Sequence, residues 1–115
     1  MSIERIKVGP RMSQAVVSGG LVYLAGQVAD DPTADVAGQT RQILSKIDNL
    51  LAEAGTDKSK LLSASVWLSD ISTFNEMNVV WDAWVTPGSP PARACVESKL
   101  ALPQLKVEIM AIAAR

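Results

Sequence analysis

The spacing of apolar residues switches repeatedly along this 115-residue chain. Short stretches with alternating or continuous apolar residues are followed by stretches in which they recur every three or four positions. The first spacing is typical of a strand and the second of a helix. The chain is therefore predicted to be an α+β protein, and its length suits one domain spanning residues 1–115.

The first predicted element is a β-hairpin. Its arms are Gln14–Ser18 and Leu21–Ala29, and Gly19-Gly20 forms a two-residue turn. The second arm is apolar at nearly every position, which predicts a central strand covered on both faces. Gly26 within it marks a bulge or a close approach by another backbone or a ligand.

A helix is predicted over residues 35–54, where Gly55 ends it. Its apolar stripe consists of Ile43, Leu44, Ile47, Leu50, Leu51 and Ala54. A strand over residues 60–69 follows, with Leu62, Ala64, Val66 and Leu68 on one face.

Thr73 and Glu76 are spaced as a capping box that opens a second helix. The Pro-rich segment 87–91 ends this helix. Two strands complete the chain, over residues 92–100 and 105–113. The predicted order is β-β-α-β-α-β-β, a mixed sheet with two helices on one face.

Composition limits the function classes. The net charge is −1 and argues against a nucleic acid as the main partner, since nucleic-acid binders concentrate positive charge. The chain has no histidine, which removes histidine-based nucleophile pairs and most zinc and iron sites. No apolar run is long enough to span a membrane. The single cysteine, Cys95, suits a reducing compartment, and a cytoplasmic location is expected.

Arg93 is the strongest candidate for a binding residue. It follows Pro90-Pro91-Ala92 at the start of a strand, and its guanidinium offers a fork of donors that matches a carboxylate. One interpretation is an anchor for a small carboxylate ligand. The other is an ion pair with Glu97 or Glu108.

Glu108 lies on a strand whose other face is apolar, so it is expected to point towards the same polar surface as Arg93. A carboxylate there would hold a water or move a proton; alternatively it pairs with Lys106 or Lys99. Cys95 shares the strand face of Arg93 and is expected to be a packing residue rather than a nucleophile.

The remaining candidates are less specific. Asn78 either lines a cleft or faces water, and the three tryptophans belong to the core or to a subunit contact. The sequence holds no phosphate-binding glycine loop and no metal-ligand cluster, so neither a cofactor nor a metal is expected.

Four segments together resemble the Rid family (YjgF/RidA, also labelled L-PSP), from Gly9 to Ala114. They are RMSQAVVSGGLVYLAGQVADDP, AGQTRQILSKIDNLLAEAG, SASVWLSDISTFNEMN and PPARACVES followed by LPQLKVEIMAIAA. The P-A-R-x-x-V-E segment with the later K-V-E-I is the most specific part. The WDAWV helix end is closer to a divergent branch.

The resemblance implies a chorismate-mutase-like fold, a homotrimer with clefts between subunits, and hydrolysis of reactive enamine or imine intermediates to 2-oxo acids and ammonia. It assigns Arg93 to the substrate carboxylate and Glu108 to the attacking water. The backbone of Cys95, together with Asn78 and Gly26, is implied to line the cleft.

Two positions depart from the family pattern. Met12 stands where relatives often carry a tyrosine, so one wall of the pocket differs, and Ala25 replaces a common serine. Two other functions remain open. One is a non-catalytic module that binds small carboxylates such as 2-oxo acids; the other, least favoured, is an endoribonuclease or translation inhibitor.

Overall fold

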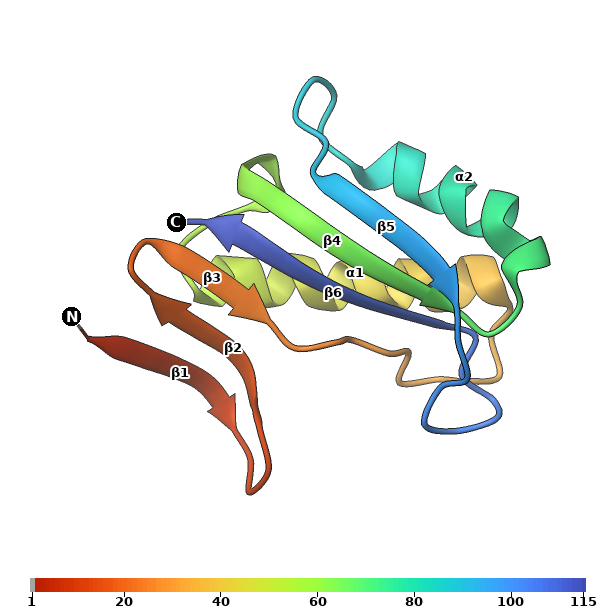
Figure 1. Cartoon of the computed structure of the whole chain (residues 1–115), viewed down its shortest axis with the longest axis horizontal. Helices are drawn as coiled ribbons and strands as arrows, with labels where there is room; N and C mark the ends of the chain where they lie inside the picture. The colour runs from red at the N-terminus through yellow and green to blue at the C-terminus, as the bar shows by residue number, and fades with distance from the viewer. Residues whose placement is uncertain (1) are drawn as a thin grey trace.

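The computed structural model describes residues 2–115, which form a six-stranded mixed sheet with two helices. The strand order across the sheet is β1-β2-β3-β6-β4-β5, and only β4 and β5 run parallel to each other. The strands are β1 (Ile3–Val8), β2 (Ser13–Ser18), β3 (Leu21–Leu24), β4 (Leu61–Leu68), β5 (Ala92–Glu97) and β6 (Val107–Ala114). Figure 1 shows helix α1 (Val36–Glu53) behind the sheet and helix α2 (Phe74–Trp84) beside β5. The α+β class and the two covering helices are as predicted from the sequence.

The first helix and the last strand form the centre of the core. The six apolar residues of the predicted helical stripe are each at most 3% exposed, and each buried Leu or Ile contributes about 1.5–3 kcal/mol to folding. Asp35 caps the helix by accepting a hydrogen bond from the Gly38 backbone N–H at 2.8 Å. On β6 alternate residues face the core: Val107, Ile109, Ala111 and Ala113 are buried.

The largest differences from the predicted strand boundaries lie in three places. Residues 3–8 form β1, an edge strand that the apolar pattern does not reveal because most of its residues are exposed. The predicted strand 21–29 ends at Leu24, and only Gln27 pairs beyond it, with Ile109. Strand β5 ends at Glu97 rather than at residue 100.

A β-bulge at the start of β4 shifts the predicted faces of that strand. The pairing with β6 changes register between Leu61 and Ser63, so Leu61 is buried while Leu62 is 48% exposed. The prediction for Leu62 was therefore wrong, because an extra residue inverts the alternation on one side of a bulge. Ala64, Val66 and Leu68 face the core as expected.

The N-terminus of helix α2 is not stabilised by the predicted capping box. Thr73 makes no side-chain cap bond; instead the Asp70 carboxylate accepts from the Ser72 N–H at 2.9 Å and from the Ser72 hydroxyl at 2.7 Å. These bonds hold a 3-10 turn, Ile71–Thr73, that leads directly into the helix. They also lower the pKa of Asp70 below its ordinary value.

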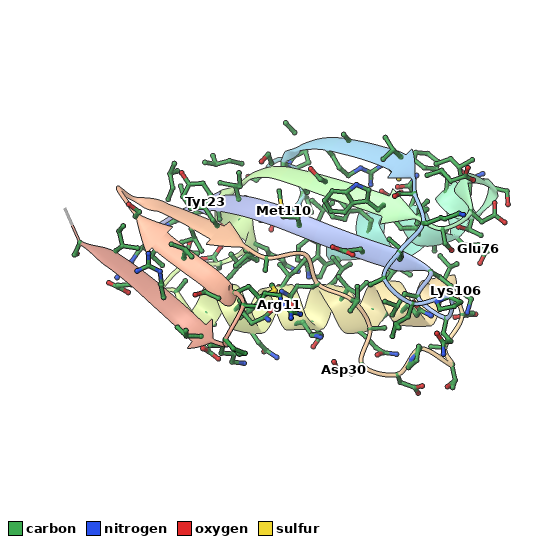
Figure 2. All side chains as sticks on the ribbon, turned by 60° about the horizontal axis from the view of Figure 1, so that its bottom comes forward. Arg11, Tyr23, Asp30, Glu76, Lys106 and Met110 are labelled. Carbon is green, nitrogen blue, oxygen red and sulfur yellow. The ribbon has the colours of Figure 1, made fainter. Side chains whose placement is uncertain are left out.

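One face of the sheet carries no helix. By strand register, this open sheet face includes side chains that are apolar or aromatic, and several of them are well exposed. They are Val16, Leu21, Tyr23, Trp67, Val96, Met110 and Ile112. Figure 2 shows Tyr23 and Met110 on this face. The prediction that the strand beginning at Leu21 is covered on both faces is thus wrong for the single chain, since Tyr23 is 42% exposed.

Candidate functional site

Arg93 lies on the edge strand β5 and points towards helix α2. Its Nη1 donates a hydrogen bond of 2.8 Å to Asn78 Oδ1 and lies 4.0 Å from Met77 Sδ. The guanidinium carbon is 5.0 Å from the ring centroid of Trp81 and 5.8 Å from that of Phe74. Helix α2 thus presents one amide and two aromatic rings to the cation, an arrangement that fixes the plane of the guanidinium.

The charge of Arg93 is not neutralised by a carboxylate. Within residues 2–115 no ion pair involves Arg93. The ion pair with Glu97 considered above does not form, because Glu97 Oε1 accepts instead from the backbone N–H of Ile71 at 3.0 Å. A half-buried guanidinium with spare N–H donors and no counter-ion is well suited to bind an anion.

Glu108 packs against Gly26. A Cβ added to Gly26 would overlap Glu108 Oε2 and lie 3.0 Å from Glu108 Cδ, so the carboxylate occupies the space that a side chain would need. The group that approaches Gly26 closely is therefore the side chain of Glu108, and not a backbone or a ligand as predicted. The alternative partner Lys106 is engaged elsewhere, since its ammonium lies 3.3 Å from the carbonyl oxygen of Ala34.

Arg93 and Glu108 do not share a surface in one chain. Arg93 is in register with Ala64, whose side chain faces the helices, whereas Glu108 is in register with Trp67 on the open sheet face. Two strand spacings and three residues separate them, so their Cα atoms are on the order of 14 Å apart. The expectation that both point to one polar surface was wrong, because the side on which a residue lies depends on the pairing register of its own strand.

Cys95 lies on the same face of β5 as Arg93, as expected, and packs against the edge of the core. Burial raises the pKa of its thiol above the ordinary value, and the nearby Arg93 cation only partly offsets this effect. The sulfur is therefore protonated at neutral pH, in keeping with a packing role.

Met12 lies in the turn between β1 and β2 and is 46% exposed. It borders a surface hollow of about 480 Å³ together with Arg11 and Gln14. The backbone bond from the Ala25 N–H to the Gln14 carbonyl, at 2.9 Å, places this turn at the same end of the sheet as Gly26. Met12, Gly26 and Glu108 thus belong to one end of the sheet, away from the Arg93 group.

The predicted residues therefore fall into two groups. Arg93, Asn78 and Cys95 form one group beside α2; Glu108, Gly26 and Met12 form a second group at the end of β3. Sequence reasoning missed the rings of Phe74 and Trp81 around Arg93. Their spacing with Asn78 on one side of α2 is the signal that would have found them, since residues three, four and seven apart share a helix face.

No group of three His, Cys, Asp or Glu residues gathers to hold a metal ion in the part of the chain that the structure describes. In the same residues, neither helix is long and apolar enough to cross a membrane.

Comparisons with known proteins agree on one family. The family model described as Endoribonuclease L-PSP matches residues 2–115. A RutC family protein of Haemophilus ducreyi is 46% identical over 112 residues, which cover 97% of this chain and 96% of the relative. The crystal structure of a YjgF family member from Neisseria meningitidis superposes with a TM-score of 0.97 at 45% identity, covering 100% of this chain and 96% of that one.

A more distant structure carries a further name of the family. A member of the Rid protein family from Yersinia pestis superposes with a TM-score of 0.91 at 28% identity, covering 99% of this chain and 100% of that one. Together with the match of the family model over nearly the whole sequence, these similarities confirm the resemblance seen in the sequence motifs. The chain belongs to the YjgF family, which is also described as Rid and as L-PSP.

Proposed function

We propose that the protein hydrolyses reactive enamine and imine intermediates of the 2-aminoacrylate type to 2-oxo acids and ammonia. The reaction is proposed to take place in clefts between the subunits of a homotrimer. The observation that carries this proposal is the Arg93 guanidinium, which is held by Asn78 between aromatic rings and has no ion-pair partner among residues 2–115.

Arg93 would bind the carboxylate of the substrate. Asn78 accepts from only one of the five N–H groups of the guanidinium, so a two-pronged contact with a carboxylate remains available. The surrounding rings and Met77 exclude part of the water from this cation, which strengthens a charge-assisted bond to roughly 1.5–3 kcal/mol.

A second copy of the chain would complete the site. Glu108 lies on the other side of the sheet from Arg93, and the open sheet face around it is apolar and unpartnered within residues 2–115. Exposed apolar patches of this kind mark protein contacts. Burying the open sheet face against neighbouring copies would bring Glu108 of one subunit towards the edge strand of the next. The number of three subunits rests on the resemblance to the Rid family.

The proposed chemistry is the addition of water to a C=N bond. An enamine first tautomerises to the imine, gaining a proton on carbon and losing one from nitrogen to water. Glu108 then orients a water and accepts its proton as the oxygen bonds to the imine carbon, and the same proton passes on to the nitrogen. The resulting carbinolamine expels ammonia and becomes the 2-oxo acid. The step consumes one water and needs no oxidant or reductant, and Arg93 supplies mainly positioning.

A second candidate function is a non-catalytic module that binds small carboxylates such as 2-oxo acids. It is favoured by the separation within one chain between the complete Arg93 group and Glu108. Such a module would keep its affinity for 2-oxo acids when Glu108 is replaced. It would not accelerate the hydrolysis of imines.

The endoribonuclease named in the family description is the least supported activity. The net charge of −1 provides no excess of cations for a nucleic-acid backbone, and the chain has no histidine for acid–base cleavage. We place the proposed reaction in the cytoplasm, which agrees with the free thiol of Cys95.

An imine-trapping assay tests the proposal. An amino-acid oxidase generates 2-imino acids, and semicarbazide competes with hydrolysis by trapping them. The wild-type protein is expected to lower the trapped fraction and speed release of the 2-oxo acid. Arg93→Lys keeps the charge but loses the planar fork, and is expected to reduce the acceleration at least about tenfold.

Arg115→Lys is the matched control, since Arg115 forms an exposed ion pair with Glu4 far from the two groups. It is expected to behave as wild type. If the wild-type protein accelerates no imine from a broad panel of amino acids but still binds pyruvate, the binding module replaces the deaminase as the proposed function.

A further inference from the structure

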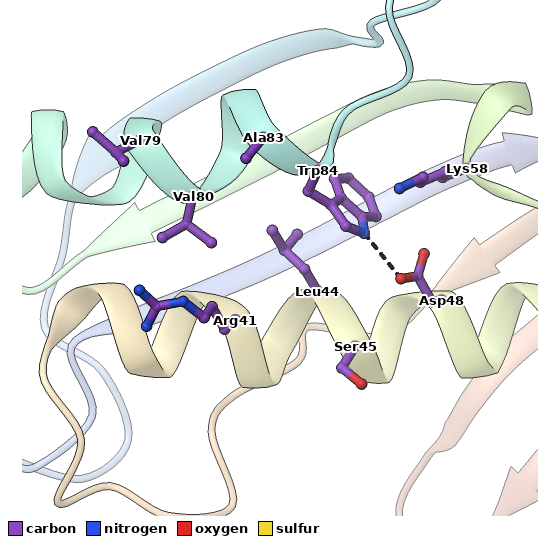
Figure 3. A pocket seen from close by; sticks show the side chains of 9 residues that line it. All are labelled: Arg41, Leu44, Ser45, Asp48, Lys58, Val79, Val80, Ala83 and Trp84. Carbon is purple, nitrogen blue, oxygen red and sulfur yellow. Dashed lines mark hydrogen bonds between the residues drawn. The ribbon is translucent and has the colours of Figure 1, made fainter.

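A second binding region lies between the two helices, on the outer side of the molecule. Helices α1 and α2 border a groove of about 440 Å³, shown in Figure 3. This volume lies in the range of small-molecule sites. The groove is lined by Arg41, Leu44, Ser45, Asp48, Lys58, Val79, Val80, Ala83 and Trp84.

One end wall of the groove is held in place by the protein itself. The indole N–H of Trp84 donates to Asp48 Oδ2 at 3.0 Å, as the dashed line in Figure 3 marks. The Lys58 ammonium lies 5.2 Å from the Trp84 ring centroid, and the Trp81 ring is 5.4 Å away on the core side. The Trp84 ring is therefore already held in one orientation, so a ligand that packs against it orders the ring at little further cost in conformational entropy.

The inner surface of the groove is apolar and accessible. Val79 is 70% exposed, although it is a large apolar side chain on a helix, and Val80 and Leu44 form the base beside it. The short side chains of Ser45 and Ala83 leave the space between the helices open. Covering such a surface with an apolar group is favourable by roughly 25 cal/mol per Å².

The charges around the groove favour an anion. Arg41 is exposed at the groove and takes part in no ion pair within the described residues, and Lys58 is the second cation. The single carboxylate, Asp48, already accepts from Trp84. The groove therefore combines an aromatic and aliphatic surface with an unpaired guanidinium.

We propose that this groove binds a small aromatic acid, with its ring system against Leu44, Val80 and Trp84 and its anionic group on Arg41. The site is separate from the Arg93 group. Asn78 and Trp81 face Arg93, whereas Val79 and Val80 line the groove, so the two sites use different sides of α2. The groove is also away from the open sheet face, and assembly through that face leaves it accessible.

Methyl NMR with 2-naphthoate as the probe tests this site on the full-length protein. The expected result is a saturable shift of the Leu44, Val79 and Val80 methyl signals. Arg41→Gln is expected to weaken the binding of 2-naphthoate about fivefold, as for the loss of one exposed charge pair. The neutral analogue 2-naphthylmethanol is expected to bind wild type and Arg41→Gln equally.

Three variants separate the possible causes of a shift. Ala83→Phe fills the groove and is expected to abolish binding. Lys60→Gln removes an exposed cation outside the groove and is expected to change nothing. Arg93→Lys is expected to leave the groove signals unchanged, which shows that they do not report on the proposed catalytic cleft.

Several outcomes would overturn the proposal. One is the absence of groove shifts at millimolar probe; another is equal affinity of 2-naphthoate for wild type and Arg41→Gln. A third is a shift of the same methyl signals with protein concentration alone, which would identify a second copy of the chain as the occupant.

Discussion

At the scale of single residues, Arg93 carries its charge among uncharged groups. An amide oxygen, a thioether and two aromatic rings surround it, and none of these cancels a full positive charge. This environment explains why an arginine on an edge strand remains free to bind an anion. The presence of Cys95 on the same face could be predicted from the two-residue spacing, since both positions belong to one strand.

The position of Glu108 relative to Arg93 could not be predicted in the same way. It depends on the strand that pairs with each residue and on the register of that pairing, which a pattern of apolar residues does not encode. The contacts of Arg93 with Phe74 and Trp81 were missed for a related reason. Trp81 is buried in the core, as one interpretation of the tryptophans predicted, but its ring also lies 5.0 Å from the Arg93 guanidinium carbon, and a pattern of apolar residues does not indicate such a contact.

Gly26→Ala tests the contact between Gly26 and Glu108. The added methyl group would displace the carboxylate, and the proposed hydrolysis is expected to slow about 10- to 100-fold, as for a misplaced catalytic group. The midpoint of thermal unfolding is expected to change little, because the Glu108 side chain can rotate away. Steady-state kinetics and a thermal melt measure the two effects.

A double-mutant cycle supplies the control for this prediction. In a Glu108→Gln background, Gly26→Ala is expected to add little further loss, since both changes act on the same group. If the fold-losses in activity of the two single variants multiply in the double variant, Gly26 acts independently of Glu108.

At the scale of elements, the helices were predicted more accurately than the ends of the strands. The apolar stripe on α1 repeats over many residues, and only a helix places all of them on one face. The bulge in β4 inserts a single residue, which changes the alternation locally and exposes Leu62. The start of α2 was predicted at the right place but with the wrong residues. A capping box and an Asp-led turn have similar compositions, and the backbone geometry decides between them.

Asp70→Ala tests the turn that precedes α2. The folded-state pKa of Asp70 is lowered first by the hydroxyl of Ser72 and then by its backbone N–H. A lowered pKa means that the ionised carboxylate stabilises the fold above the ordinary value of 3.8, and that this contribution is lost as the pH falls through the folded-state pKa. Asp70→Ala is therefore expected to be less stable than wild type at neutral pH.

Urea unfolding at pH 7 and at a pH well below 3.8 measures the difference between the two proteins. The difference should shrink at the acidic pH. Asp82→Ala is the control, since Asp82 is an exposed carboxylate on α2 that lies outside this turn. A stability difference for Asp70→Ala that is the same at both pH values would show that its ionised form plays no part.

At the scale of the whole molecule, the open sheet face is the feature that a single chain leaves unexplained. Tyr23, Val96 and Met110 are each more than one-third exposed, whereas the other face of the sheet packs against the helices. The sequence pattern suggested a strand covered on both faces, and the single chain covers only one. We infer that neighbouring copies supply the missing cover.

Met110→Lys tests this inference. An ammonium group in the middle of the open sheet face would be buried without a partner on assembly, so the variant is expected to dissociate. Light scattering after size exclusion should give about three times the 12.2 kDa chain mass for wild type and a smaller mass for the variant. Val79→Lys, on the helical side, should assemble normally; a wild-type monomer at micromolar concentration would contradict the inference.

The most direct measurement of a cleft shared between subunits is the activity of mixed assemblies. Arg93→Ala and Glu108→Gln chains, each expected to be strongly impaired but not fully inactive as a homotrimer, are co-expressed with different tags, and mixed trimers are purified through both tags. If Arg93 of one subunit acts with Glu108 of its neighbour, every mixed trimer contains one intact cleft out of three, which is expected to restore imine hydrolysis to about a third of the wild-type rate per trimer. Mixed trimers that stay as inactive as either parent would contradict the shared cleft.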